Sequence, residues 1–181
     1  MLSMINLSLD LFKMERGTYV LRPEPVDMAI MVRRLFTELE SLAGFKKLFL
    51  ELTINGRAAG VEAEAVISGE RLLLYTMLAN CVKNAVEASP EGATVTVDVR
   101  PGDPVLLTIR NRGAVPVGLR GKFFEKFATE GKVGGTGLGA YSARLIAEAH
   151  GGFARMETSD ETDTTTITLI MPQCGGRASL A

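Results

Sequence analysis

Residues 70–88 constrain the fold more than any other segment, because they have the length and apolar content of a long helix. Pro90 and Gly92 stop the segment. Its flanks are apolar, with Leu73, Leu74, Met77, Leu78, Val82 and Val86. Polar residues recur at positions i, i+3, i+4 and i+7, namely Asn80, Lys83, Asn84 and Glu87. On a helix these four side chains fall within an arc of about 100°, so they form a single polar stripe.

The stripe has two interpretations. A polar helix face is most often a solvated outer face. However, asparagine in the middle of a helix costs a few tenths of a kcal/mol, roughly, and Glu, Lys or Gln would suit a solvated face better. The amide oxygen of asparagine can bind Mg²⁺ without cancelling its charge, which leaves phosphates and water to complete the coordination shell. The stripe therefore also fits a magnesium and phosphate site.

Composition excludes several classes of protein. A chain of 181 residues is long enough for one domain that needs no disulfide or metal staple. Its 20 Lys and Arg nearly balance 21 Asp and Glu, which argues against a nucleic-acid binder. Two distant cysteines, Cys81 and Cys174, and a single histidine, His150, indicate neither a zinc site nor a disulfide framework. With no apolar run of about 18 residues and no leader pattern, we expect a cytoplasmic chain without direct membrane contact.

The first sixteen residues differ from the rest of the chain. Apolar residues recur there at steps of three and four, namely Leu2, Ile5, Leu9 and Phe12, which is the seam of a helix that packs on another helix. The pattern stops near Gly17, and Pro23 and Pro25 predict an extended connection. Because one such helix is not stable alone, we interpret it as the end of a longer element whose partner is absent from this chain.

The remaining pattern predicts an α/β domain. A helix begins after Asp27 as its N-cap and buries Leu35, Phe36, Leu39 and Leu42. A last helix covers about residues 138–150. Strands are predicted at 48–54, 61–68, 94–100, 105–111, 153–157 and 164–171. Residues 112–136 are glycine-rich and lack periodicity, which predicts a long loop of the kind that usually has a function.

Three further segments carry chemical information. The glycine-rich run 134–139 leads into a helix, where backbone N–H groups can bind an anion, although its spacing fits neither the P-loop nor the Rossmann fingerprint. The run Asn111-Arg112-Gly113 ends a strand and, taken alone, is an ordinary turn. The aromatic run 123–127 is either a small cluster beneath the long loop or the anchor of a movable lid.

Together and in this order, the segments resemble the ATP-binding domain of sensor histidine kinases, in the GHKL (Bergerat-fold) ATPase superfamily. Residues 80–88 resemble the N box, with Glu87 in a position where the family also uses Lys. Residues 111–113 resemble the G1 box, 124–127 the F box and 135–139 the G2 box. The resemblance covers about residues 5–172, and four boxes in order make a chance match improbable.

The resemblance implies a two-layer α/β sandwich, in which a mixed, mostly antiparallel sheet packs on three helices. It further implies that residues 1–17 end a dimerisation helix and 18–26 form a linker. Residues 27–173 would then be the ATP-binding catalytic domain, followed by a tail at 174–181.

The resemblance also implies a nucleotide site for ATP and Mg²⁺. Asn84 would ligate Mg²⁺, and Asn80, Lys83 and Lys132 would act on the phosphates as the catalytic group. Backbone amides would come from Gly135, Gly137, Leu138 and Gly139, and Thr165 would help hold the adenine. The remaining expected nucleotide-site residues are Glu87, Asn111, Gly113, Phe124, Phe127 and Thr136. A lid over residues 114–134 would fold across the nucleotide.

Two asparagines depart from the patterns of the superfamily. The family usually has Asp at the position of Asn111, where the carboxylate accepts a hydrogen bond from the adenine amino group. A neutral amide is a weaker acceptor and can also donate, so we predict measurable ATP binding with weakened adenine selectivity. Related ATPases carry a Glu base at the position of Asn80. Since asparagine cannot take a proton from water, the sequence argues against fast ATP hydrolysis.

The chain also departs from the family in that it contains no histidine suited to be the phospho-acceptor. His150 is expected to be a packing residue in the last turn of a helix, tolerant of positive charge there. The leading hypothesis is therefore transfer of the ATP γ-phosphoryl group to a histidine on a dimerisation bundle outside this chain. The resemblance implies that bundle and a response regulator as partners, within a homodimeric parent. The alternatives are a nucleotide-dependent binding module and an anti-sigma-type serine protein kinase, and the N-terminal seam favours the histidine kinase over the latter.

Overall fold

A six-stranded sheet forms one layer of the protein. The computed structural model describes residues 2–60, 64–128 and 137–172, the side chains of residues 2–8 excepted. The strands lie in the order β3-β2-β5-β6-β8-β7, and their bounds are β2 (Phe49–Ile54), β3 (Arg57–Ala58), β5 (Thr94–Arg100), β6 (Val105–Arg112), β7 (Phe153–Ser159) and β8 (Thr164–Met171). Among the strands that the structure describes, only β2 and β5 pair in parallel, so the predicted mixed, mostly antiparallel sheet is confirmed.

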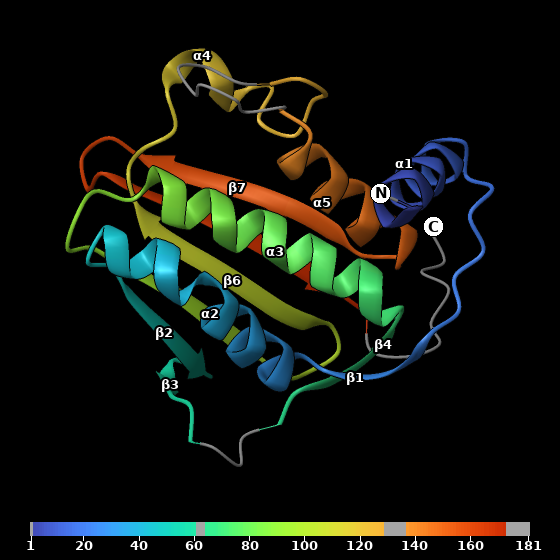
Figure 1. Ribbon diagram of the computed structural model, residues 1–181, viewed down its shortest axis with the longest axis horizontal. Coiled ribbons are helices and arrows are strands. Elements are labelled where there is room, and N and C mark those ends of the chain that lie inside the picture. Colours follow the sequence, from blue (N-terminus) through green and yellow to red (C-terminus); the bar gives the residue numbers. More distant parts are fainter. Residues whose placement is uncertain (1, 61–63, 129–136, 173–181) are drawn as a thin grey trace.

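Three helices form the second layer and cover one face of the sheet (Figure 1). They are α2 (Met28–Phe45), α3 (Arg71–Ala88) and α5 (Gly139–Ala149). The side chains of β5, β6 and β8 alternate, so that Val97, Ile109 and Ile167 are buried under the helices. Residues next to them in the chain, such as Arg110, point to the opposite face, which the helices leave uncovered. The predicted two-layer α/β sandwich is confirmed.

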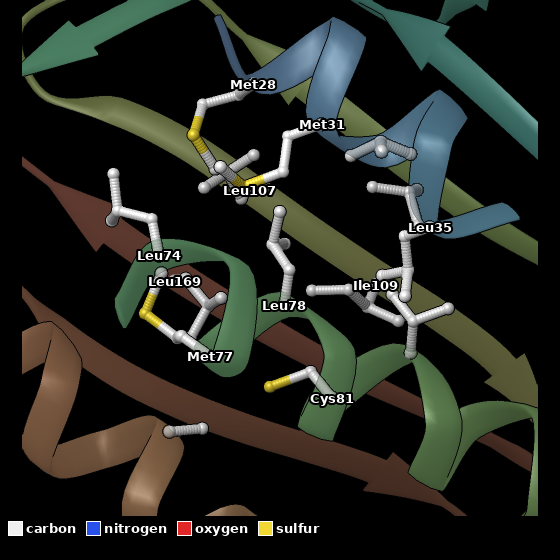
Figure 2. Packing of buried hydrophobic residues seen from close by; sticks show 14 of the residues in the cluster. Met28, Met31, Leu35, Leu74, Met77, Leu78, Cys81, Leu107, Ile109 and Leu169 are labelled. Carbon is white, nitrogen blue, oxygen red and sulfur yellow. The ribbon is translucent and has the colours of Figure 1, made fainter. Parts of the chain in front are cut away.

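The core lies between α3 and the sheet. Leu74, Met77 and Leu78 of α3 are fully buried and point toward Leu107 and Leu169 of the sheet (Figure 2). Burial of these apolar side chains is the main favourable contribution to folding. Because the same helix carries the polar stripe, the core also fixes the direction in which that stripe points.

Helix α2 begins as the sequence predicts. The Asp27 carboxylate accepts hydrogen bonds from the backbone N–H groups of Ala29 at 2.8 Å and Ile30 at 3.3 Å, which is an N-cap. Leu35 is buried, and Phe36 and Leu39 are half-buried against the core. The expectation that Leu42 is buried is wrong, because the last turn of α2 presents Ala43 to the core and leaves Leu42 exposed.

Three short elements differ from the sequence expectations. The strand predicted at 61–68 is described only as β4 (Val66–Gly69), which pairs with β1 (Glu24–Asp27) in a separate two-stranded sheet. The proline-containing segment is extended as predicted, and Pro25 is tolerated in β1 because such a short ribbon has open edges. β3, and α4 (Val117–Arg120) inside the predicted loop, were also not expected from the sequence. β4 depends on long-range pairing with β1, whereas β3 has only two residues and α4 spans one turn, so hydrophobic periodicity does not reveal them.

Helix α1 (Leu2–Glu15) lies beside α5 (Figure 1). Met14 is buried against the core, whereas Leu9 and Phe12 of the predicted seam are 54% and 50% exposed. The Glu15 carboxylate accepts a hydrogen bond from the Tyr141 hydroxyl and pairs with the Lys126 ammonium group. The end of α1 is therefore attached to the domain. The domain does not cover the described part of the α1 seam, Leu9 and Phe12.

Among the described residues, none of the helices combines the length and the apolar character that crossing a lipid bilayer requires.

His150 caps the C-terminus of α5 and is buried. Its Nδ1 lies 2.7 Å from the carbonyl oxygen of Ile146, and its Nε2 accepts a hydrogen bond from the backbone N–H of Glu70 at 3.0 Å. These contacts fit a neutral ring protonated at Nδ1. Burial lowers the pKa of His150, although the Ile146 carbonyl and the Glu70 charge oppose that effect. The predicted packing role is therefore confirmed, and the predicted tolerance of positive charge is wrong because desolvation dominates.

This lowered pKa makes stability depend on pH. Above the ordinary histidine pKa of 6.5 the ring is neutral in both states, but below it the unfolded chain takes up the proton more readily than the folded chain. The free energy of unfolding should therefore fall as the pH drops from about 6.5 toward 5. His150→Gln should reduce this slope, as measured by urea unfolding at several pH values. An identical slope in the variant would contradict the assignment.

Candidate functional site

A cavity of about 380 Å³ opens between α3, the beginning of α5 and the adjoining ends of β6 and β8. Nine of the residues expected at a nucleotide site line it, namely Asn80, Lys83, Asn84, Glu87, Asn111, Gly113, Gly137, Gly139 and Thr165. The volume lies within the usual range of small-molecule pockets. Segments that are far apart in the sequence thus converge on one cavity.

Helix α3 supplies the polar wall of the cavity. Asn80 and Asn84 are half-buried and one turn apart, so their amides follow each other along the wall. Lys83 and Glu87 are exposed at the rim, where their charged groups lie 3.8 Å apart. The stripe is therefore more than a solvated outer face, because all four of its residues line the cavity.

The first turn of α5 lies against the two asparagines. A Cβ atom added to Gly139 would sit 3.5 Å from Nδ2 of Asn84 and 3.7 Å from Oδ1 of Asn80. Glycine at this position keeps the space beside both amides open. The N-terminal end of α5, with its partial positive charge, therefore lies next to the polar wall.

A pair of buried polar residues forms the inner end of the cavity. Asn111 of β6 and Thr165 of β8 are direct partners in the strand register and are 4% and 5% exposed. Nδ2 of Asn111 donates to the Arg112 carbonyl at 2.7 Å, and the Thr165 hydroxyl donates to the Gly113 carbonyl at 2.7 Å. Oδ1 of Asn111 is thus left as an acceptor, and the predicted weakening of adenine selectivity stays a prediction.

Gly113 permits the close approach of this inner end to α3. Its φ is +109°, and a Cβ atom there would lie 2.8 Å from the carbonyl oxygen of Ala88. A larger residue would therefore separate the end of β6 from the end of α3.

Three of the expected residues do not line the cavity. Phe124 instead packs edge-on against Phe123, with 5.0 Å between ring centroids, and it is Phe123 that lines the cavity. Phe127 is 69% exposed, and its N–H is bonded to the carbonyl of Gly137 at 3.1 Å. Leu138, the third, precedes α5 and is also exposed.

Three more expected residues, Lys132, Gly135 and Thr136, lie outside the described residues.

The cavity also has an apolar wall that the sequence reasoning missed. It consists of Val115, Leu119, Phe123 and Ile167. Val115, Leu119 and Phe123 fall within the segment 114–134 that the resemblance assigns to a lid, but only Phe123, in the aromatic run, was singled out in the sequence. Such a wall beside the buried Asn111 and Thr165 suits a flat, partly polar group.

The two ends of the cavity have different chemistry. The inner end offers apolar surface and buried hydrogen-bonding groups, whereas the α3 end offers amide oxygens, a lysine and a helix N-terminus. Amide oxygens suit Mg²⁺, and ammonium groups and helix N-termini suit phosphates. The donor set present therefore fits a magnesium-bound nucleotide with its base at the inner end.

Comparison with known protein families agrees with this chemistry. The model of the histidine kinase-, DNA gyrase B- and HSP90-like ATPases matches residues 69–174, more than half of the chain. The chain belongs to this ATPase family. The match contains α3, α5 and every described residue that lines the cavity.

A relative with a similar sequence is the circadian input-output histidine kinase CikA of Synechococcus elongatus. It is 28% identical over 182 residues, which covers 96% of this chain and 23% of CikA. A sensor-like histidine kinase of Rhizobium meliloti is 27% identical, covering 98% of this chain and 34% of that protein. The ATPase-family chain thus spans between about a quarter and a third of the length of these curated relatives.

Solved structures show the same fold. Full-length ShkA in complex with AMPPNP superposes with a TM-score of 0.74 at 20% identity, covering 97% of this chain and 36% of that chain. The histidine kinase AdeS of Acinetobacter baumannii gives a TM-score of 0.75 at 17% identity, covering 94% of this chain and 77% of that chain. At these identities the likeness establishes the fold of the histidine kinase ATPase domain.

Proposed function

We propose that this chain is the ATP-binding catalytic part of a sensor histidine kinase. One observation carries the proposal: Asn80, Lys83 and Asn84 line the cavity beside the N-terminus of α5, in a chain of the ATPase family. The names of the relatives support the same activity, since both are histidine kinases. On this proposal, the chain acts in the cytoplasm as part of a two-component system.

The residues of the chain divide the proposed work. Asn84 would hold Mg²⁺ through its amide oxygen, and Lys83 and Lys132 would place positive charge near the phosphates. When bound, the cation would neutralise charge on the transferring phosphoryl group. Backbone amides of the glycine-rich segment 134–139 would bind phosphate oxygens, and Asn111 and Thr165 would contact the adenine. Positioning and electrostatics therefore supply most of the catalysis.

At the γ-phosphorus, the proposed reaction forms one bond and breaks one. A lone pair on a neutral imidazole nitrogen forms a P–N bond to the γ-phosphorus. The bond from that phosphorus to the β–γ bridging oxygen breaks, and ADP leaves with its electron pair. The proton on the other ring nitrogen passes to solvent. Asn80 cannot act as a base toward water, so hydrolysis should compete poorly with transfer.

The acceptor histidine has to come from another segment. His150 is buried, and both of its ring nitrogens are already in hydrogen bonds. The exposed Leu9 and Phe12 on α1 fit the expected continuation into a dimerisation bundle, which we propose carries the acceptor in a homodimeric parent. We further propose that residues 1–17 belong to that bundle, 18–26 to a linker, 27–173 to the catalytic domain and 174–181 to a tail. A receiver domain of a response regulator is the proposed next partner.

Labelled ATP tests this function directly. With Mg²⁺, the chain alone should stay unlabelled, because it lacks an available histidine. Adding the His-containing bundle of the longer parent protein should give a label on the bundle that is stable to base and lost in acid, as expected for phosphohistidine. The matched control is the same bundle with its acceptor His replaced by Gln, which should stay unlabelled.

Other outcomes separate the alternatives. Tight ATP binding without transfer to the bundle would favour a nucleotide-dependent binding module. An acid-stable label on a serine of a partner protein would favour the anti-sigma-type kinase. The absence of ATP binding would contradict the proposal altogether.

A further inference from the structure

Ser142 lies in none of the motifs discussed above, yet it contacts the first asparagine of the cavity. It belongs to α5 and is 4% exposed. Its Oγ accepts a hydrogen bond from Nδ2 of Asn80 at 2.8 Å and donates one to the carbonyl of Gly139 at 3.0 Å. Ser142 does not itself line the cavity, so it reaches the cavity through Asn80.

The directions of these hydrogen bonds determine how the Asn80 amide is turned. A serine hydroxyl has one hydrogen to donate. In Ser142 that hydrogen goes to the Gly139 carbonyl, which leaves only acceptor lone pairs facing Asn80. An acceptor attracts the NH₂ end of an amide and repels its oxygen. Ser142 therefore fixes Nδ2 of Asn80 toward its own hydroxyl, and the planar amide presents Oδ1 away from Ser142, near Gly139 at the start of α5.

Oδ1 of Asn80 is available for a ligand. Among the described residues, none donates a hydrogen bond to this oxygen, although Asn80 is half-buried in the cavity wall. The oxygen lies near the start of α5, 3.7 Å from the position that a Cβ on Gly139 would take. Because Asn80 lines the cavity, this acceptor faces space that water, a donor or a cation can occupy.

We propose that Ser142 is a positioning residue that holds Oδ1 of Asn80 ready for a magnesium ion or its bound water. This inference rests on the proposed function. A phosphate oxygen is itself an acceptor and would repel Oδ1. In this orientation the Asn80 amide therefore suits the cation and its bound water rather than the phosphates. Without Ser142 the Asn80 amide can rotate, so that in a fraction of the molecules Nδ2 takes the place of Oδ1.

Hydrogen exchange of the Asn80 side chain tests the hydrogen bond without any nucleotide. In ¹⁵N-labelled chain, the Asn80 NH₂ signals are assigned by their loss in Asn80→Ala. They should exchange with water more slowly than those of the exposed Asn55, and Ser142→Ala should remove this protection. Equal exchange in the unchanged chain and in Ser142→Ala would overturn the inference.

Binding of magnesium–ATP tests the consequence through a double-mutant cycle. Ser142→Ala should weaken binding by roughly fivefold, the scale of one hydrogen bond. In an Asn80→Ala background the same change should have no further effect, because Ser142 acts only through Asn80. Ser142→Thr, which keeps the hydroxyl, should restore most of the affinity. Thermal unfolding of each variant confirms that it is folded.

The outcomes distinguish this inference from the proposed function. If Ser142→Ala weakens binding equally with and without Asn80, then the serine acts through α5 and the inference is wrong. Unchanged binding in Ser142→Ala would also overturn it. If the unchanged chain fails to bind magnesium–ATP, the proposed function is wrong, whereas the exchange measurement still decides whether Ser142 holds Asn80.

Discussion

Replacing Asn84 by alanine should abolish magnesium-dependent ATP binding. Its amide lies in the wall of the cavity one turn after Asn80, beside the first turn of α5. Loss of a group that ligates the metal directly should reduce affinity by roughly a hundredfold or more, since even outer-shell ligands are worth about 10- to 100-fold. Titration of a fluorescent ATP analogue, with and without Mg²⁺, measures the change. Asn84→Asp should lose binding as well, because its charge opposes that of the phosphates.

A residue about two turns earlier on the same helix provides the control. Thr76 lies outside the cavity, and its hydroxyl donates to the backbone carbonyl of Leu72. Thr76→Ala should therefore bind magnesium–ATP like the unchanged chain. If Asn84→Ala also kept the original affinity, the assignment of the metal ligand would be wrong.

Leu78→Ala should cause a large loss of stability, far larger than an alanine substitution on the exposed face of α3. Leu78 is fully buried and lies among apolar side chains of α2 and the sheet, such as Met31 and Leu107 (Figure 2). Removing a buried leucine side chain costs about 2–5 kcal/mol, through lost burial and the cavity that remains. The free energy of unfolding from urea titration at neutral pH measures this loss.

The same helix supplies a matched substitution at its surface. Leu72 is 67% exposed, so Leu72→Ala should change the free energy of unfolding by less than about 0.5 kcal/mol. Equal losses for Leu72→Ala and Leu78→Ala would mean that α3 does not pack as the structure shows. Because α3 also carries Asn80 and Asn84, Leu78→Ala should in addition lower ATP affinity at temperatures where it begins to unfold.

Local patterns in the sequence predicted most of the regular elements. The polar stripe and the stop at Pro90 placed the long helix within one residue of α3, and Asp27 predicted the start of α2. These features depend on neighbouring residues, which a sequence displays directly. The pairing of β1 with β4, and the parallel pairing of β2 with β5, join residues about 40 positions apart or more. Such pairings depend on how the whole chain packs, so hydrophobic patterns do not specify them.

The site was predictable to the extent that its residues are polar or glycine. Asn80, Asn84 and Asn111 stand out in the sequence because asparagine is unusual in helices and strands. The apolar wall at Val115 and Leu119 has no such signal, since apolar residues are expected throughout a core. Ser142 was missed for a different reason: a single serine in a helix becomes informative only when its partner across the interface with α3 is known.

The face of the sheet that the helices leave uncovered determines where substitutions can accumulate in this sequence during evolution. Along β5, β6 and β8 the residues alternate between the face under the helices and the open face. The register that pairs Asn111 with Thr165 also pairs Arg110 with Thr166 on the open face. Substitutions at Arg110 or Thr166 touch neither the core nor the cavity. Drift should therefore accumulate at every second position of β6 and β8, so that a survey of tolerated substitutions would show a two-residue period there. In β5 the period should be interrupted at Asp98, which lies on the open face but is buried and accepts hydrogen bonds from Thr53 and Gly56.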